Sequence, residues 1–173
     1  MPLPPDLPRS SLSAVVFRVV RAGLDPLATT GSLKAGGRFN PPNEFGALYT
    51  SLEAAIAAKE VARGLRQRGI DPDQFPDGAW WVYELEVKLD SVLDLTDAVV
   101  LQKSGLSESS LTGGDIRQTR EIAAEARKHG YEALLVPSAA ASGSRNLVIF
   151  LDKASARPNV LSSRPISFRE KTA

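Results

Sequence analysis

Glu60 is a charged residue at a position where the sequence predicts a buried, apolar side chain. Residues four apart lie on one face of a helix, so Glu60 continues the row that begins with Leu52 and Ile56. The next member of that row is Gly64, which leaves open space beside the carboxylate. An unpaired buried charge is costly, so this carboxylate needs a partner, a ligand or a shifted pKa. Glu60 is therefore a candidate catalytic residue; the alternative is an ion pair with Arg63 at the edge of the stripe.

Two arginines are candidates for binding an anion. Arg18 interrupts the β-branched run 12–20, and Arg38 follows the glycine pair Gly36-Gly37. A guanidinium offers paired donors to a phosphate or carboxylate, and glycines let the backbone approach a ligand closely. The alternatives are an edge strand with Arg18 in solvent and an ordinary loop around Arg38. The glycine pair fits neither the P-loop nor the GxGxxG pattern, so a Rossmann-type site is unsupported.

Three more polar residues adjoin predicted strands. Ser138 follows an apolar strand, where active-site loops often begin, and Asn146 directly precedes the last strong strand. Tyr49 lies within a short strand. Taken alone, each has an ordinary structural role as its alternative: a serine that bonds its own turn, a turn asparagine and a core tyrosine.

Composition excludes several kinds of catalytic site. The chain has no cysteine, which removes disulfides, thiolate nucleophiles and cysteine-based zinc sites. Its single histidine, His129, excludes a polyhistidine metal site within one chain, and also a Ser-His-Asp triad unless His129 itself serves. A net charge of +1 gives no general field that would attract nucleic acid.

Length and hydropathy favour one soluble domain. With 43% hydrophobic and 24% charged residues, the 173 residues can form one core. We expect a single domain over 1–173, in which a proline-rich lead (1–11) and a polar tail (157–173) are peripheral. No apolar run reaches the roughly 18–20 residues of a membrane span, and the N-terminus lacks the apolar core of a signal peptide. These features predict a cytoplasmic protein.

The elements that must position the candidate residues follow from the hydrophobic pattern. Strong strands are predicted at 12–20, 47–50, 80–87, 133–136 and 147–151. Helices are predicted at 52–68, with Ser51 as the cap, and at 115–129. Weaker signals indicate a short strand and turn at 90–100, an edge strand at 165–168, and loops at 21–43, 104–114 and 137–145. This combination is typical of an α+β fold.

Taken together, the candidate residues lie in an ordered series of motifs that resembles the RES domain, a family named for its arginine, glutamate and serine. The segments Gly36-Gly37-Arg38-Phe39-Asn40-Pro41-Pro42, Leu48-Tyr49-Thr50-Ser51 and Ala54 to Glu60 are similar to the family signature GGRWNPPG…YTS…A…E. Pro137-Ser138-Ala139 and Asn146-Leu147-Val148 resemble its second block, and Arg18 stands at the family's early strand arginine. The resemblance spans residues 16–151.

The sequence departs from the family pattern at three places. Phe39 replaces the commoner tryptophan, which preserves an aromatic ring. Asn43-Glu44 stands where a glycine usually follows the second proline, and Val19 replaces an aromatic residue after the early arginine. None of these departures removes a candidate catalytic group.

The resemblance implies an ADP-ribosyltransferase-like fold, with a split, mainly antiparallel sheet, flanking helices and a cleft for NAD. It implies a toxin that degrades NAD by cleaving the nicotinamide–ribose bond, through hydrolysis or through phosphorolysis with inorganic phosphate. It also implies neutralisation by a cognate antitoxin of the Xre helix-turn-helix type. DNA would be contacted only through that antitoxin. No metal, no cofactor beyond NAD as substrate and no membrane partner are expected.

The resemblance also assigns roles to the candidate residues. The catalytic set it implies is Glu60, Arg38, Tyr49 and Ser138, and the NAD-binding set is Arg18, Arg38, Tyr49, Ser138 and Asn146. Cleavage of the nicotinamide–ribose bond develops oxocarbenium character, which a carboxylate stabilises. Arginines suit the pyrophosphate, a tyrosine ring suits nicotinamide or ribose, and a serine hydroxyl suits the amide or a phosphate.

Two other functions fit the same residues. Transfer of ADP-ribose to a protein would use the same cleft, because water, phosphate or a side chain can each accept the ribose. The third hypothesis is a binding module that has lost catalysis, which the joint presence of the four catalytic candidates disfavours. A ribonuclease is disfavoured by the near-neutral charge and the single histidine.

Overall fold

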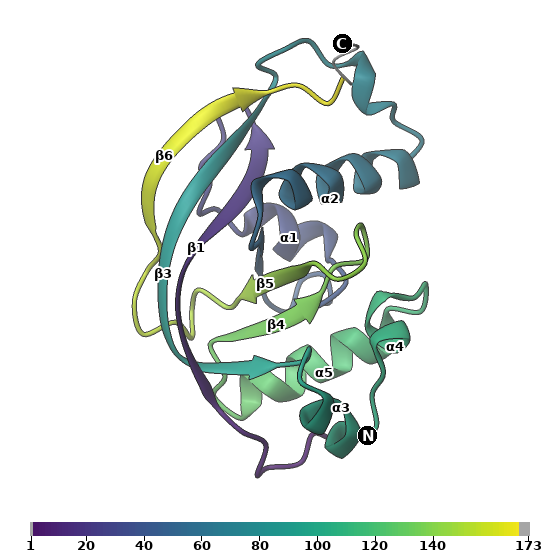
Figure 1. The fold of residues 1–173 in the computed structure, drawn as a ribbon, viewed down its shortest axis with the longest axis vertical. Helices are drawn as coiled ribbons and strands as arrows, with labels where there is room; N and C mark the ends of the chain where they lie inside the picture. Colours follow the sequence, from purple (N-terminus) through teal and green to yellow (C-terminus); the bar gives the residue numbers. More distant parts are fainter. Residues whose placement is uncertain (1, 170–173) are drawn as a thin grey trace.

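A single sheet of six strands forms the centre of the computed structural model, which describes residues 2–169 (Figure 1). The strands are β1 (Ser10–Arg21), β2 (Leu48–Ser51), β3 (Trp80–Asp94), β4 (Ala133–Pro137), β5 (Arg145–Ile149) and β6 (Asn159–Ile166). Their order is β1-β2-β5-β4-β3-β6, and β1 also pairs with β3. Only the β3–β4 ladder is parallel; the other ladders are antiparallel.

The extra pairing of β1 with β3 closes five of the strands into a ring, so the sheet is a barrel and the expected split is wrong. The closure depends on the length of β3, whose end at 92–94 pairs with β4 while its longer part pairs with β1. On the opposite side, β1 meets β2 through one residue pair, Phe17 with Ser51. A long, coiled strand can thus serve different neighbours at its two ends.

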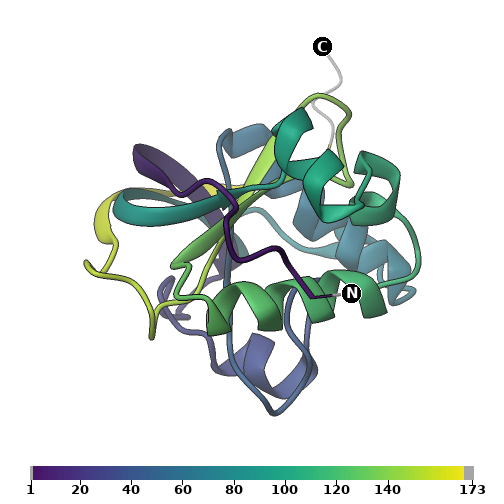
Figure 2. The same ribbon diagram turned by 90° about the horizontal axis from the view of Figure 1, so that it is seen from below.

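Helices flank the barrel, which confirms the α+β prediction. They are α1 (Thr30–Ala35), α2 (Ala54–Gln67), α3 (Ala98–Ser104), α4 (Glu108–Thr112), α5 (Arg117–Lys128) and the 3₁₀ turn Pro72–Gln74. Helix α2 packs on β1, and α4 packs on α5 and β4. Figure 2 shows α5 and the α3–α4 pair on the underside of the barrel. No helix within residues 2–169 is long and apolar enough to cross a membrane.

Several local predictions need correction. The loop expected at 21–43 contains α1, and the loop expected at 104–114 contains α4. Both helices have only five or six residues, too few for a helical period to be visible in the sequence. The short strand expected at 90–100 is partly the continuation of β3. Ser51 does not cap α2, because it lies in β2 and the helix begins after Glu53.

The lead is not peripheral, in contrast to the prediction, whereas the tail forms the exposed edge strand β6. Leu3 and Leu7 are buried in the core against α5, and the hydroxyl of Tyr131 donates to the carbonyl of Leu7. At the other end, β6 pairs with β3, and the Phe168 ring contacts the Trp80 ring edge-on. Proline-rich and polar composition suggested loose ends, but isolated apolar residues there fill gaps in the core. Residues 1 and 170–173 of the predicted lead and tail lie outside the described residues.

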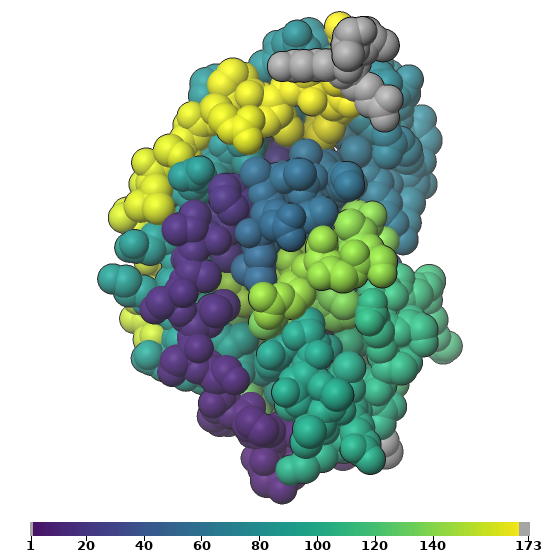
Figure 3. All heavy atoms as spheres, in the orientation of Figure 1, coloured from purple at the N-terminus to yellow at the C-terminus, as the bar shows by residue number. Residues whose placement is uncertain are grey.

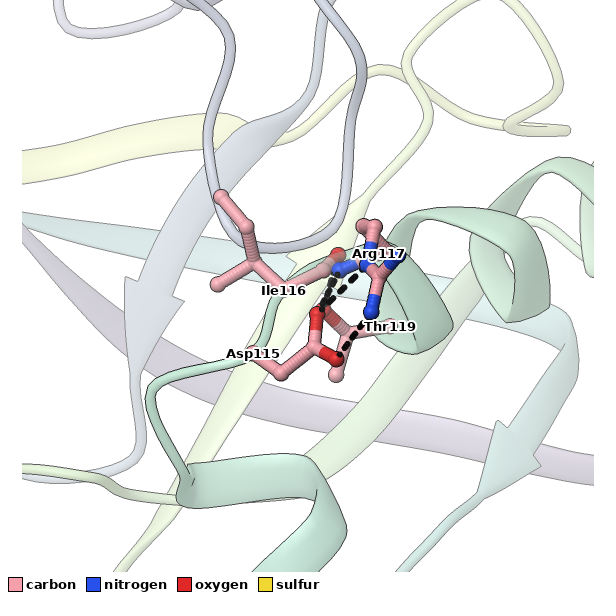
Figure 4. Close-up of polar contacts among 4 residues, drawn as sticks. All are labelled: Asp115, Ile116, Arg117 and Thr119. Atoms are coloured by element: carbon pink, nitrogen blue, oxygen red, sulfur yellow. Dashed lines mark hydrogen bonds and ion pairs between the residues drawn. The ribbon is translucent and has the colours of Figure 1, made fainter.

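Asp115, two residues before helix α5, accepts a hydrogen bond from the first residue of the helix (Figure 4). The Asp115 carboxylate accepts from the backbone N–H of Arg117 at 3.0 Å and also pairs with the Arg117 guanidinium. A carboxylate at this position accepts from an N–H group that has no partner within the helix, and its negative charge stabilises the positive end of the helix dipole. The ion pair with Arg117 is exposed and contributes little to stability. In the same turn, Thr119 donates to the carbonyl oxygens of Ile116 and Arg38. This turn therefore fixes the loop that carries Arg38.

Glu132 is a buried carboxylate that holds backbone together rather than serving a site. It is 4% exposed, and it accepts from the backbone N–H groups of Asp90, Ser91 and Ser155. Burial raises the pKa of Glu132, but these hydrogen bonds outweigh it and bring the pKa below its ordinary value. The charged form therefore stabilises the fold.

We expect Glu132→Gln to lower the free energy of unfolding by about 1–2 kcal/mol at pH 7, because the amide leaves buried donors unsatisfied. The stabilising effect is present above the unfolded pKa of about 4.3 and is lost as pH falls through the lower folded pKa. Urea unfolding from pH 7 to pH 3 should show the difference between wild type and variant shrinking at acid pH. Glu44→Gln, at an exposed loop position, is the control. A difference that does not depend on pH would contradict this account.

Candidate active site

The Glu60 carboxylate lies against two side chains from the distant β4–β5 hairpin. Its Oε1 accepts from the Ser138 hydroxyl at 2.6 Å and from the Asn146 amide Nδ2 at 2.7 Å. The N–H of Ala140 adds a longer contact at 3.4 Å. The predicted alternative, an ion pair with Arg63, does not form among the described residues. Helical spacing thus correctly placed Glu60 toward other protein groups.

Only one oxygen of this carboxylate is used by the protein. All hydrogen bonds to Glu60 from residues 2–169 go to Oε1, and Oε2 accepts none of them. The residue is half-buried. Three donors hold Oε1 in place and so orient the carboxylate. Oε2 is therefore available to a ligand, either as a hydrogen-bond acceptor or as a negative charge.

Asn146 is itself oriented by the neighbouring strand. Its Oδ1 accepts from the Ser51 hydroxyl at 2.7 Å, and Ser51 pairs with Asn146 in the β2–β5 ladder. Because Oδ1 is engaged as an acceptor, Nδ2 is directed to Glu60 as a donor. Sequence reasoning missed this role of Ser51, although the residue lies in the YTS block. The signal for Ser51 in the sequence was its position in this motif, but the residue was interpreted as the N-cap of the following helix.

Ser138 is almost fully buried at 4% exposure and begins the loop that joins β4 to β5. Its hydroxyl accepts from the N–H groups of Ala140 and Ala141 and donates to Glu60. It is therefore both the turn serine of the structural alternative and a partner of the carboxylate. Figure 3 shows this loop, in light green, between α2 and the α3–α4 segment. Direct contact of Ser138 with NAD remains a prediction.

Arg38 reaches the same region from the glycine loop. Its Nη1 donates to the carbonyl oxygens of Leu111 and Gly113, at the end of α4. Burial and the positive charge of Arg63 lower the pKa of Arg38, while Glu60 opposes them. The guanidinium is thus held by backbone carbonyl oxygens at the end of α4.

Tyr49 anchors the glycine loop through its hydroxyl. The group donates to Oδ1 of Asn40 at 2.7 Å and accepts from the N–H of Phe39 at 3.0 Å. Burial raises the pKa of Tyr49 to about 12, so the hydroxyl stays neutral at physiological pH. The glycine at 37 is required here, because a Cβ on Gly37 would lie 2.4 Å from this oxygen. The predicted contact of Tyr49 with nicotinamide or ribose is not tested by these contacts.

Asn40 is a further buried residue that sequence reasoning did not single out. Its Nδ2 donates to the carbonyl oxygens of Ser32 and Phe45, at 2.8 and 2.9 Å. Together with the bond from Tyr49, these contacts tie α1, the loop and β2 into one unit. The glycine loop is also held by α5, because Arg120 donates through Nε to the carbonyl oxygen of Gly37 at 2.8 Å. The signal for Asn40 was its place in the GGRFNPP block.

Arg18 is half-buried, its Nε is buried, and β1 pairs on both sides, so the alternative of a solvent-exposed guanidinium on an edge strand is wrong. Its Nη1 and Nη2 donate to the carbonyl oxygens of Tyr49 and Ala28, at 3.3 and 3.2 Å. Burial lowers the pKa of Arg18 to about 10, opposed by Asp25. The contacts brace β2 and the segment after β1. Among residues 2–169 no hydrogen bond joins Arg18 to Glu60, so its contact with NAD stays a prediction.

No group of three or more His, Asp or Glu side chains within residues 2–169 is placed to hold a metal ion. The side chains gathered at Glu60 are one carboxylate, a hydroxyl from Ser138 and an amide from Asn146. A negative oxygen in such a setting stabilises positive charge that develops on a bound ligand.

Comparison with known proteins places this chain in a family. The NAD(+) phosphorylase MbcT of Mycobacterium tuberculosis is 28% identical over 152 residues, covering 88% of this chain and 80% of its own length. A probable NAD(+) phosphorylase of the same organism, Rv3189, is 34% identical over 124 residues, 72% of this chain and 56% of that protein. A solved structure of the M. tuberculosis MbcT-MbcA toxin-antitoxin complex contains a chain with the same fold. It matches with a TM-score of 0.80 and 23% identity, over 91% of this chain and 86% of that one. Because residues 15–169 match the RES domain, this chain belongs to the RES-domain family.

Proposed function

We propose that this protein is a toxin that degrades NAD by cleaving the bond between nicotinamide and ribose, and that a cognate antitoxin neutralises it. The observation that carries the proposal is the Glu60 carboxylate, with Oε1 held by Ser138 and Asn146 and Oε2 left for a ligand. The names of the relatives support NAD as substrate and phosphate as acceptor. The complex in which the structural neighbour occurs supports an antitoxin partner.

The reaction balances without an acid, a base or a metal. The bond between C1 of the ribose and the nicotinamide nitrogen breaks, and its electron pair stays on that nitrogen, which becomes neutral. An oxygen of a phosphate dianion then bonds to C1, giving ADP-ribose 1-phosphate with no proton transfer. In hydrolysis, water attacks instead and releases one proton. Positive charge develops at C1 in both cases, so Oε2 of Glu60 belongs beside that carbon.

The remaining site residues act on the position of the substrate and of Glu60. Ser138 and Asn146 fix the carboxylate, and Tyr49 holds the glycine loop against the barrel. Arg38 binds the pyrophosphate of NAD through N–H groups that its bonds to the α4 carbonyls leave free. Arg18 supports β2 through its hydrogen bond to the carbonyl of Tyr49. The cleft itself is ADP-ribosyltransferase-like, the antitoxin is of the Xre helix-turn-helix type, and the toxin acts in the cytoplasm.

An experiment with NAD labelled in its adenylate portion identifies the acceptor of the ADP-ribose group. Incubation of the purified protein with this NAD and inorganic phosphate should release nicotinamide and place the label in ADP-ribose 1-phosphate. Without phosphate, the rate should fall and any labelled product should be free ADP-ribose. Label retained on a protein band would instead indicate ADP-ribosyl transfer. If NAD stays intact under every condition, the proposal is contradicted and the result favours the hypothesis of a binding module without catalysis.

A further inference from the structure

Ser51 is a buried serine at the end of β2 that lies one side chain away from the Glu60 carboxylate. It is 3% exposed and pairs with Asn146 in the β2–β5 ladder. Its Oγ donates to Oδ1 of Asn146 at 2.7 Å, and Nδ2 of the same amide donates to Oε1 of Glu60 at 2.7 Å. Asn146 therefore connects a hydroxyl group fixed in the sheet to the carboxylate on α2.

The chemistry of the three groups fixes the direction of these two hydrogen bonds. An ionised carboxylate only accepts, so the amide of Asn146 presents Nδ2 to Glu60. Its Oδ1 then faces Ser51, whose hydroxyl is the donor. If the amide turned by about 180°, Oδ1 would face Oε1 of Glu60, and two acceptors would meet without a proton between them. The amide thus has one favourable orientation, in which Oδ1 needs a donor.

Ser51 supplies that donor from a fixed position. The terminal torsion of an asparagine side chain is soft, so a hydrogen bond at one end leaves the plane of the amide free to rotate. Bonds at both ends hold the plane, and the second bond comes from a strand whose four residues all pair with β5. Without the Ser51 hydroxyl, the amide of Asn146 would be held at its Glu60 end only, and Glu60 would lose a fixed neighbour.

We propose that Ser51 is a positioning residue for NAD cleavage, which acts through Asn146 on the orientation of Glu60. The inference rests on the proposed function and deepens it, because it identifies a buried residue that sets the rate without contacting the substrate. Oε2 stabilises charge at C1 of the ribose only while Oε1 is held, and a misplacement of about 1 Å is enough to lower a rate by about 100-fold. Loss of the hydroxyl therefore affects the chemical step more than the binding of NAD.

The test compares Ser51→Ala with Thr50→Val, a matched control on the same strand. Thr50 is also 3% exposed, and its Oγ1 donates to the carbonyl oxygen of Leu147 at 2.8 Å across the same ladder. Each variant removes one buried hydroxyl donor, so both should lower the melting temperature to a similar extent. Only Ser51→Ala should lower kcat for nicotinamide release, by about tenfold or more, while KM for NAD changes less than about twofold.

A double-mutant cycle shows whether Ser51 acts through Asn146. Ser51→Ala should have little further effect on kcat once Asn146→Ala is present, because the group that Ser51 orients is gone. Additive effects of the two substitutions would overturn the inference, as would wild-type kcat in Ser51→Ala or an equal fall of kcat in Thr50→Val. Each of these results would leave NAD cleavage by the wild-type protein intact.

The positioning can also be measured without substrate, by NMR exchange of the Asn146 Nδ2 protons with water. These protons should exchange faster in Ser51→Ala than in wild type, and Thr50→Val should match wild type. Equal exchange in all three proteins would overturn the inference. If the wild type releases no nicotinamide, the proposed function is wrong, and the exchange rates still decide whether Ser51 holds the amide.

Discussion

Glu60→Gln should lower kcat for nicotinamide release by about 100-fold or more, the size of effect that follows loss of one preorganised electrostatic group. Glutamine keeps an oxygen that can accept from Ser138 and Asn146, so the fold around the site should persist. It removes the negative charge from the position of Oε2, where positive charge develops at the ribose. The change therefore affects the transition state more than the bound substrate, and KM for NAD should move much less than kcat.

The control is Glu53→Gln, which neutralises a carboxylate at the start of the same helix that makes no side-chain capping bond. Its kcat should equal that of wild type, and all three proteins should unfold at similar temperatures. A Glu60→Gln variant that keeps wild-type kcat would remove Glu60 from the chemistry. If Glu60→Gln unfolds, its loss of activity says nothing about catalysis, and Glu60→Asp is measured instead. Aspartate keeps the negative charge but places it one methylene further from the ligand.

Gly37→Ala should lower the free energy of unfolding by about 1–3 kcal/mol, the usual range for forcing an extra methyl into a packed site. The new Cβ would lie 2.4 Å from the Tyr49 hydroxyl oxygen and 2.9 Å from Oδ1 of Asn40. Neither atom can retreat easily, because Tyr49 and Asn40 bond each other and Asn40 is fully buried. The loop should move as a unit and displace Arg38, so NAD cleavage should fall as well.

Gly64→Ala is the matched control, since its added Cβ meets no atom within 4 Å. As a helical glycine in open space, it should raise stability by about 0.5–1 kcal/mol. Urea unfolding of both variants measures the contrast. Equal stability of Gly37→Ala and wild type would show that the loop accommodates a methyl group and that the Tyr49–Asn40 contact does not fix it.

The sequence could predict that the Glu60 side chain faces other parts of the protein, because the signal is local: a carboxylate in an apolar helical row. Its partners could not be derived in the same way. Ser138 lies 78 residues away and Asn146 lies 86 residues away, and only the β4–β5 hairpin brings both to one oxygen. Ser138 and Asn146 each resembled a turn residue when taken alone. The family motif was the only signal in the sequence that assigned both of them to the same site. For Arg18 the pattern left both a buried anion-binding role and solvent exposure open, and it did not indicate the carbonyl oxygens to which the guanidinium donates.

The fold was predictable where strands and helices were long. The class and most strands follow from β-branched runs, whereas barrel closure depends on β1 meeting both β2 and β3, a contact between distant segments. Leu3 and Leu7 were missed because two apolar residues among prolines carry no period, although both are buried. Five-residue α4 was missed for the same reason, and it supplies the carbonyls that hold Arg38.

The most direct test of the central claim is the time course of nicotinamide release from excess NAD by the purified protein in phosphate buffer, followed by proton NMR. The account predicts that free nicotinamide accumulates over many turnovers per enzyme molecule and that an equal amount of phosphorylated ADP-ribose appears. It also predicts that the release requires Glu60. Intact NAD after prolonged incubation with folded wild-type protein, free of antitoxin and with phosphate present, would contradict the account.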